Sequence, residues 1–324
     1  MNTSHHTSTT FNCKAIALDL DGTLTNHEKV ITPLTKKALL EAQEKGISII
    51  LASGRPTYGI APLADELGLD TKGGYILAYN GGKIVDWRTK EEIYSNCLPE
   101  DVIPEIYEYA KIHQHALLGY KGKEIVTECP TDKYVLEESR INKMPVRKVE
   151  NLLDVIERNP TKLLMTGDPE DMKKAETDLA GIMKGRMDVF RSAPFFVELV
   201  PMGIDKAESL KRLLAIMGIG TENLMSFGDG YNDISMIKLA GMGIAMENAA
   251  PEIKEAADYV TLSNEGSYNI VVFLTICISY ANNCFTGSPK KFMGESFTND
   301  FIILQQSFRN SSNILLTYIS PYCL

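Results

Sequence analysis

Short apolar runs alternate with amphipathic segments over the first eighty residues. The runs CKAIALDL, ISIILAS and YILAYNGG predict strands, and the second is apolar throughout, as in a parallel strand that is buried on both faces. TPLTKKALLEAQEKG and YGIAPLADELG predict helices between them. Thr32 is placed to cap the first helix, Pro33 occupies its first position and Gly46 ends it. This alternation predicts a doubly wound parallel sheet.

The pattern becomes mixed after residue 83. We expect a hairpin in KIVDWRTKEEIYSNCL, further strand pairs, and helices such as DVIPEIYEYAKIH and PEDMKKAETDLAGIMKG. After Pro201 the alternation of helices and short apolar strands returns, in KAESLKRLLAIMG, NLMSFGDG and GIAME. We therefore predict an α/β fold, with a doubly wound, Rossmann-like parallel-sheet core formed by 12–83 and 197–270 and an α+β cap domain inserted at 84–196.

The segment 271–324 differs from the rest of the chain in composition. It is poor in charged residues, rich in Asn, Ser, Phe and Ile, and has no clear hydrophobic period. The run NIVVFLTICISY, at 269–280, is compatible with a last helix or strand, but it is shorter than the roughly 18 apolar residues of a membrane span. We assign this tail no role.

Composition and charge narrow the class of protein. Hydrophobic residues make up 44% of the chain and charged residues 23%, as in a globular protein, and the net charge of -9 offers no basic surface for nucleic acid. The polar N-terminus lacks an apolar signal core, and the six cysteines form no CxxC pair, so we expect free thiols in the cytoplasm and no membrane partner. An anionic substrate would need local cations.

Polar residues follow several of the predicted strands. Asp19 and Asp21 end the first strand, and their alternation places both side chains on one face, where two carboxylates repel unless a cation or a proton compensates them. Because ligands bind at the carboxyl ends of the strands in open α/β sheets, we expect one site at this edge. The other candidates there are Ser53 in ASGRP, Lys206 at the start of a helix, and Asp229 and Asp233 in GDGYND.

These residue types suit phosphoryl chemistry. Two or three carboxylates at one edge suit Mg²⁺, which uses few protein carboxylates and keeps bound waters. A hydroxyl, a lysine and backbone amides at helix starts suit a phosphate group, and a carboxylate can act as a covalent nucleophile toward phosphorus. Each signal alone has an ordinary explanation: a helix cap for Ser53, a solvated lysine for Lys206, a helix N-terminal charge for Asp233. Their occurrence together favours the site.

DLDGT, SGR, the isolated Lys206 and GDGYND resemble, in order, the four motifs of the haloacid dehalogenase-like phosphatase superfamily. The long insertion and the YNGG segment are similar to the corresponding parts of its Cof-type group. The resemblance as a whole covers roughly residues 12 to 266. The resemblance implies that Asp19 is the nucleophile and Asp21 the general acid/base. It also implies a phosphate site, formed by Ser53, Gly54, Lys206 and Asn232. A Mg²⁺ site is implied as well, formed by Asp19, the backbone carbonyl of Asp21 and Asp229, with Asp233 in support.

We therefore expect a Mg²⁺-dependent phosphomonoesterase with a mobile cap, acting on small phosphorylated metabolites through an aspartyl-phosphate intermediate. Sugar phosphates, nucleotides and cofactor phosphates all remain open as substrates, and so does the oligomeric state. One alternative is a phosphotransferase or mutase on the same fold. Another, from a different class, is a phospho-accepting signalling receiver, although a receiver is a single small domain without a large cap.

Overall fold

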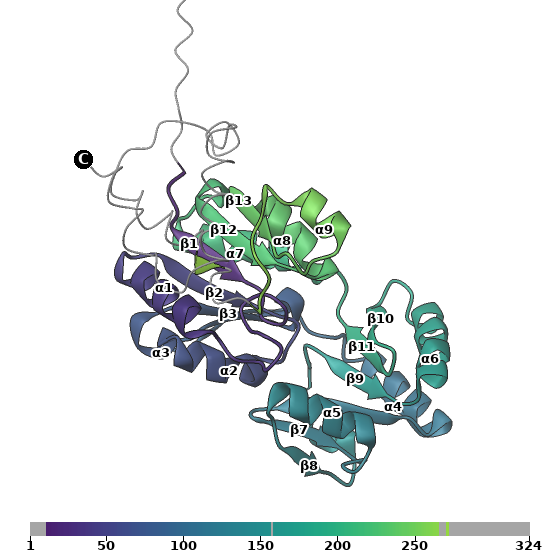
Figure 1. The fold of residues 1–324 in the computed structure, drawn as a ribbon. Helices are drawn as coiled ribbons and strands as arrows, with labels where there is room; N and C mark the ends of the chain where they lie inside the picture. The colour runs from purple at the N-terminus through teal and green to yellow at the C-terminus, as the bar shows by residue number, and fades with distance from the viewer. Residues whose placement is uncertain (1–10, 157, 266–269, 272–324) are drawn as a thin grey trace, which may run out of the picture.

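A parallel sheet forms the centre of the larger unit in the computed structural model, which describes residues 11–156, 158–265 and 270–271. Eight strands from these residues lie in the order β14-β13-β12-β1-β2-β3-β4-β5 (Figure 1). Neighbours from β14 to β3 are parallel, whereas β4 and β5 are antiparallel additions at one edge. The strands are β1 (Ala15–Leu18), β2 (Ser48–Ala52), β3 (Tyr75–Ala78), β4 (Lys83–Asp86), β5 (Glu92–Ser95), β12 (Leu224–Gly228), β13 (Met242–Ala245) and β14 (Tyr259–Val260).

Helices cover both faces of this sheet, as the doubly wound prediction requires. Ile16 and Leu18 of β1 pack with α1 and α2, whereas the alternating Ala15 and Ala17 pack with α7 and α8. Thr32 caps α1 by accepting the Thr35 N–H, which confirms the predicted start of that helix. The helices of this unit are α1 (Pro33–Glu44), α2 (Thr57–Glu66), α3 (Leu69–Lys72), α7 (Lys206–Met217), α8 (Ile234–Leu239) and α9 (Pro251–Ala256).

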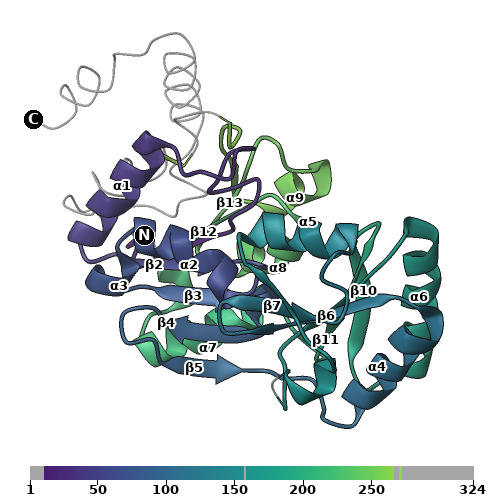
Figure 2. The ribbon, with the colours of Figure 1, turned by 90° about the horizontal axis from the view of Figure 1, so that it is seen from below.

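A second, mixed sheet forms the smaller unit, with its strands in the order β10-β11-β9-β6-β7-β8. Figure 2 shows β6, β7, β10 and β11 of this sheet together with α4 and α6. Buried side chains join one face to α4 and α6 and the other face to α5. Helix α5 also contacts α2 of the larger unit. The elements are β6 (Ala116–Lys121), β7 (Glu124–Thr127), β8 (Val146–Lys148), β9 (Leu163–Thr166), β10 (Asp188–Ala193), β11 (Phe196–Val200), α4 (Val102–His113), α5 (Lys133–Asn142) and α6 (Pro169–Ile182).

Strand pairing moves the expected domain boundaries. The hairpin of β4 and β5, which we expected to open the cap, pairs with β3 of the larger sheet, and Ile84 is fully buried there. Conversely, β11 pairs with β9 and β10, although we expected residues from 197 onward to belong to the core. Divided by sheet, the inserted unit lies between Ser95 and about Pro201 rather than at 84–196. Periodicity could not show this, because a hairpin has the same pattern in either sheet.

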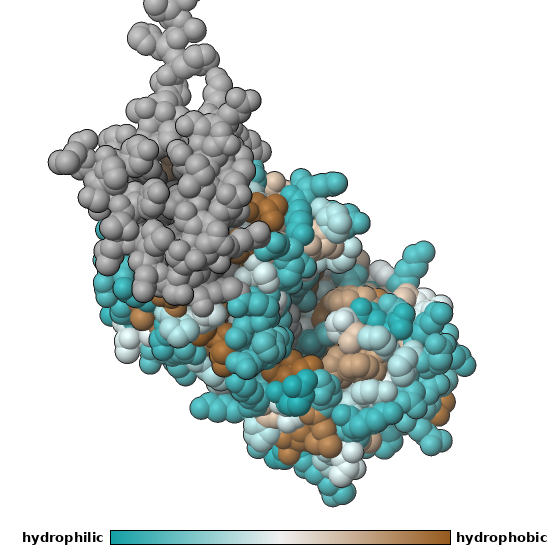
Figure 3. Space-filling view, in the orientation of Figure 1, coloured by the Kyte–Doolittle hydropathy of each residue, from teal (hydrophilic) through white to brown (hydrophobic). Residues whose placement is uncertain are grey.

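The end of the chain is described only in part. Ile270 and Val271 are buried in the core cluster that contains β1 and β2, and the rest of the predicted tail, 272–324, lies outside the described residues. Among the residues that the structure describes, every helix is too short or too polar to span a bilayer. The surface is hollowed where the larger and smaller units meet (Figure 3).

Candidate active site

Lys206 joins two of the predicted aspartates at the carboxyl edge of the larger sheet. It is the first residue of α7, and its fully buried Nζ donates to Asp19 Oδ1 at 2.7 Å, to Asp233 Oδ1 at 2.6 Å and to the Ala52 carbonyl at 3.0 Å. Asp19 follows β1, Ala52 ends β2, and Asp233 follows β12. The ends of three neighbouring strands therefore meet at one ammonium group. The sequence had indicated only that these residues share one edge of the sheet.

Burial and neighbouring charges shift the pKa values of this cluster. Burial, and then repulsion from Asp233, raises the pKa of Asp19 to about 8 despite the nearby lysine. Burial alone would lower the pKa of Lys206, but attraction to Asp19 and Asp233 outweighs it and raises that pKa instead. The lysine therefore stays charged, while the carboxylates exceed it in number. A further cation would relieve the repulsion that remains.

Asp229 is held beside this cluster by residues of two loops. The Thr23 hydroxyl donates to its Oδ1 at 2.8 Å, and the Asn248 amide donates to its Oδ2 at 3.2 Å. Gly22 has a φ of +88°, and a Cβ on it would lie only 2.2 Å from Asp229 Oδ2, so DLDGT needs glycine at this position. We did not predict Thr23 or Asn248. Thr23 stands inside the quoted motif, whereas nothing in the local sequence marks Asn248.

The donor set fits a hard divalent cation. One carboxylate oxygen from each of Asp19, Asp229 and Asp233 lies within 4.8 Å of the others. Asp233 Oδ1 accepts from Lys206, and its Oδ2 accepts the N–H groups of Asp229 and Gly230 at 3.1 and 2.9 Å. Asp233 is thus engaged in orienting its neighbours, and Asp19 and Asp229 are better placed to hold the ion. Burial raises the pKa of Asp229 as well.

The Asp21 side chain does not join that acidic group; it forms ion pairs with two cations. Arg55 Nε donates to Asp21 Oδ2 at 2.7 Å and its terminal nitrogen to Oδ1 at 2.5 Å, while Lys29 Nζ lies 2.7 Å from Oδ1. Burial opposes the change, but the hydrogen bonds and charge of Arg55, followed by Lys29, lower the pKa of Asp21. Arg55 was visible in SGR but not selected, and Lys29, at a φ of +61°, carries no sequence signal.

Apart from Lys206, the expected phosphate-binding residues follow β2 and β12, and Asn80, which follows β3, contacts both groups. Ser53 is buried, and its Oγ accepts the Arg55 N–H at 3.2 Å. Asn232 Nδ2 donates to Asn80 Oδ1 at 2.8 Å, and a Cβ on Gly54 would lie 3.1 Å from the Asn80 amide nitrogen. Asn80 therefore links Gly54 to Asn232. We had connected YNGG only with entry into the cap and had not selected Asn80 for the site.

Comparisons with known proteins identify relatives of this chain. The family model of the haloacid dehalogenase-like hydrolases matches residues 16–270. A solved haloacid dehalogenase-like hydrolase from Bacteroides thetaiotaomicron is 48% identical, with a TM-score of 0.80, and covers 82% of this chain and 99% of its own. TM0651 from Thermotoga maritima is 28% identical, with a TM-score of 0.75, and covers 82% and 97%.

Among curated proteins, the 5-amino-6-(5-phospho-D-ribitylamino)uracil phosphatase YcsE of Bacillus subtilis (strain 168) is 31% identical over 254 residues, which are 78% of this chain and 90% of that protein. The chain belongs to the haloacid dehalogenase-like hydrolase family, as its four motifs indicated, and it is a phosphatase. Its acidic cluster is compatible with the magnesium dependence that is general in this family.

Proposed function

We propose that this protein is a Mg²⁺-dependent phosphomonoesterase that hydrolyses small phosphorylated metabolites through a phosphorylated Asp19. The observation that carries the proposal is the position of Asp19, whose Oδ1 is fixed by buried Lys206 while Asp229 and Asp233 lie within reach at the same sheet edge. This supports the proposal, because the carboxylate that would attack, a lysine cation and the carboxylates that would hold a metal lie together before any substrate binds.

The residues support a two-step reaction. The Asp19 carboxylate attacks phosphorus, the leaving alkoxide takes a proton from Asp21, and a water that Asp21 deprotonates then hydrolyses the aspartyl-phosphate. Lys206 offsets charge on the phosphoryl oxygens, with Ser53, Gly54 and Asn232 as further phosphate contacts. Mg²⁺, held by Asp19, Asp229 and the Asp21 backbone carbonyl with Asp233 in support, would supply electrostatic stabilisation of the transferring group.

One relative supports the substrate class. YcsE acts on a small phosphorylated molecule, and the alignment covers most of both chains, including the inserted unit. This supports a metabolite, rather than a protein or a nucleic acid, as the substrate. The second sheet, with its three helices, also argues against a signalling receiver, which needs no such domain.

Release of free phosphate tests the proposal. The full-length protein should release it from a panel of sugar phosphates, nucleotides and cofactor phosphates in the presence of Mg²⁺, and should lose the activity in chelator. Transfer of the phosphoryl group to an added alcohol without free phosphate would identify the phosphotransferase alternative. A stable phosphoprotein without turnover would identify the receiver.

A further inference from the structure

Two asparagines lie in the loops that follow the last two strands of the larger sheet. Asn248 follows β13 and Asn264 follows β14, and the side-chain oxygen Oδ1 of Asn248 accepts the Asn264 N–H at 3.2 Å. Strands β13 and β14 lie at one edge of the sheet and carry none of the four motifs. Their loops nevertheless contact the candidate active site through this pair of asparagines.

Asn248 contacts two segments that are expected to bind the metal. Its amide nitrogen Nδ2 donates to Asp229 Oδ2 at 3.2 Å and to the Gly22 carbonyl at 2.9 Å. Gly22 lies in the loop after β1, residues 19–32, and directly follows Asp21, whose backbone carbonyl is a further expected ligand. An asparagine amide has two N–H bonds to donate. Both are used here, and they link the Asp229 carboxylate to the chain that presents the Asp21 carbonyl.

The orientation of the Asp229 carboxylate is set at both of its oxygens. The Thr23 hydroxyl donates to Oδ1 at 2.8 Å, and Asn248 donates to Oδ2. Thr23 belongs to the loop after β1, whereas Asn248 belongs to the loop after β13. Each oxygen thus has its own donor, and the two donors come from different loops.

Asn264 connects Asn248 to the base of the loop after β1. It is buried, and its Nδ2 donates to the Thr25 carbonyl at 2.9 Å while its N–H donates to Asn248. Thr25 is fully buried, and both its N–H and its hydroxyl donate to the Leu20 carbonyl at 2.9 Å. The asparagine pair is therefore attached to the fixed part of the loop that carries Asp21.

These hydrogen bonds matter more for geometry than for the stability of the fold. Asn248 is exposed, so water can replace its hydrogen bonds after a substitution, and the net contribution of such bonds to folding is small. Groups that orient metal ligands have a larger effect on the metal. Their substitution typically weakens metal binding roughly 10- to 100-fold.

We infer that Asn248 and Asn264 are positioning residues for Mg²⁺, which hold the Asp229 carboxylate and the loop after β1 at the spacing that the ion requires. The inference rests on the metal site of the proposed function. It adds no ligand to that site. It gives the loops after β13 and β14, which lie outside the four motifs, a role in the chemistry.

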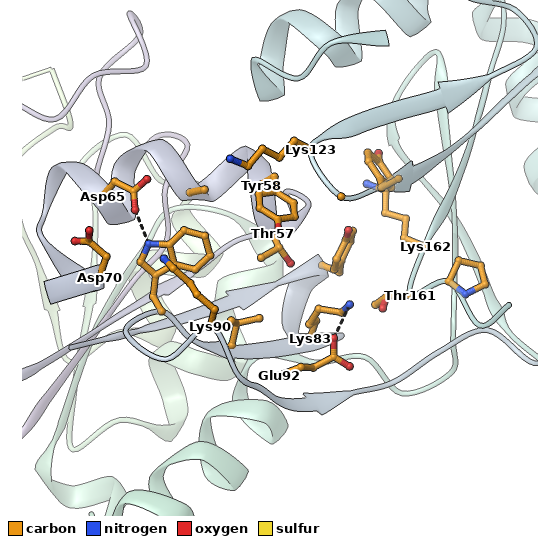
Figure 4. Close-up of a pocket in the computed structure, with 17 residues that line it drawn as sticks. Thr57, Tyr58, Asp65, Asp70, Lys83, Lys90, Glu92, Lys123, Thr161 and Lys162 are labelled. Atoms are coloured by element: carbon orange, nitrogen blue, oxygen red, sulfur yellow. Dashed lines mark hydrogen bonds and ion pairs between the residues drawn. The ribbon is translucent and has the colours of Figure 1, made fainter. Parts of the chain in front are cut away.

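The asparagine pair is separate from the cavity between the two units. That cavity, of about 610 Å³, is faced by Thr57 and Lys83 from the larger unit and by Lys162 from the inserted unit (Figure 4). Neither asparagine is among the described residues that line it. A substitution in the pair should therefore change the affinity for Mg²⁺ more than the KM of a phosphate ester.

Isothermal titration calorimetry of the full-length protein with Mg²⁺ alone tests the inference. Asn248→Ala removes all three hydrogen bonds of the side chain, so we expect its Kd for Mg²⁺ to rise roughly 10- to 100-fold. Asn264→Ala keeps the backbone N–H and removes only the bond to Thr25, so we expect a rise of roughly 3- to 10-fold. Because the two residues act through each other, the rise in the double variant should be smaller than the product of the two.

Asn223→Ala is the matched control. Asn223 precedes β12, at the end of that strand opposite the site, and its Nδ2 donates to the Asn12 carbonyl at 2.7 Å. The control therefore loses the same kind of bond between distant segments, and its Kd for Mg²⁺ should equal that of the wild type. Melting temperatures in chelator should fall by similar, small amounts in all three single variants. If Asn248→Ala melts below the assay temperature, the milder Asn264→Ala decides the test.

An unchanged Kd in both asparagine variants, or an equal rise in Asn223→Ala, would overturn the inference. So would a higher KM for phenyl phosphate at saturating Mg²⁺ with an unchanged Kd, because the pair would then act on the substrate. A wild-type protein that binds no Mg²⁺ contradicts the inference and the proposed metal site together. The expected order of Kd values in a protein that releases no phosphate from any ester supports the inference and contradicts only the proposed hydrolysis.

Discussion

Asp19 and Asp21 are two residues apart, yet the fold gives them opposite surroundings. Asp19 is buried beside Asp233, and its pKa is raised to about 8. Asp21 forms ion pairs with Arg55 and Lys29, and its pKa is lowered. These directions, which hold without a bound cation, run opposite to the proposed roles, because a nucleophile must be ionised and a general acid protonated. A cation held by Asp19 and Asp229 would lower the pKa of Asp19 and favour its ionised form. The two side chains thus differ in the partners that set their charge. The proposed roles of nucleophile and general acid/base can therefore be separated by single substitutions.

Asp19→Asn should abolish turnover and phosphoenzyme formation, because it removes the attacking carboxylate. Asp21→Asn should slow alkyl phosphate hydrolysis about 10²–10⁴-fold, the usual contribution of a general acid/base. It should impair the first step less with an aryl phosphate, whose leaving group needs little protonation. Steady-state rates on both ester types, with mass spectrometry of a hydroxylamine-labile adduct on Asp19, check this. Near-normal turnover of Asp19→Asn would instead indicate direct attack by water.

At pH 9, where Asp19 has lost its proton, Lys206→Met should cost about 3–5 kcal/mol of unfolding free energy in chelator, because it leaves Asp19 and Asp233 buried without their shared cation. Lys211, in the same helix, pairs with Glu208 at the surface, so Lys211→Met should change stability by less than about 0.5 kcal/mol. Urea denaturation of both variants measures the difference. A loss below about 1 kcal/mol for Lys206→Met would show that the two carboxyl groups are neutral in the metal-free protein.

At the scale of elements, the two chain segments that connect the sheets decide which part of the chain a related cap can replace. Asn96 N–H donates to the Gly82 carbonyl at 2.7 Å, and Asn96 Nδ2 donates to the Met202 carbonyl at 3.2 Å. The two chain crossings are thus tied together just beyond β5 and β11. We propose that the exchangeable unit lies between these crossings, and that the hairpin of β4 and β5 stays with the catalytic core.

A chimera that replaces 97–201 with a related cap should fold and keep its Mg²⁺ requirement while its substrate ranking changes. A chimera cut at 84 and 196 should be markedly less stable, because it removes buried Ile84 and Val85 from the edge of the larger sheet. Denaturant midpoints and activity with and without chelator compare the two. Equal stability of both chimeras would refute the boundary drawn from strand pairing.

At the scale of the whole molecule, stability should depend jointly on pH and metal. Because the pKa of Asp19 is raised in the folded state, the folded protein holds a proton between about pH 4 and pH 8 that the unfolded chain has released. Asp19 therefore makes the metal-free protein less stable as pH rises through this window. A divalent cation bound to the carboxylates replaces that proton and competes with it.

Mg²⁺ should consequently raise the melting temperature more at pH 8 than at pH 5. Thermal unfolding at both values, with Mg²⁺ or with chelator, measures the effect, and Asp229→Asn serves as the variant with a weakened site. The same increase at both values would show that Mg²⁺ binds away from Asp19, and no increase at either would argue against the proposed metal site.

Local sequence alone determined the strands that carry the site and the order of the motifs along them. Alternation of apolar runs and helices, the Thr32 cap and the placement of Lys206 at a helix start are short-range features, and the structure reproduces them. The contacts among Asp19, Lys206 and Asp233 span up to 214 residues of chain, so only packing of β1, β12 and α7 could bring them together. Tertiary packing likewise brings Asn80 to Asn232 and Asn248 to Asp229. It also decides which sheet the hairpin of β4 and β5 joins. Hydrophobic period shows which face of an element is buried, whereas its partner is decided by the tertiary fold.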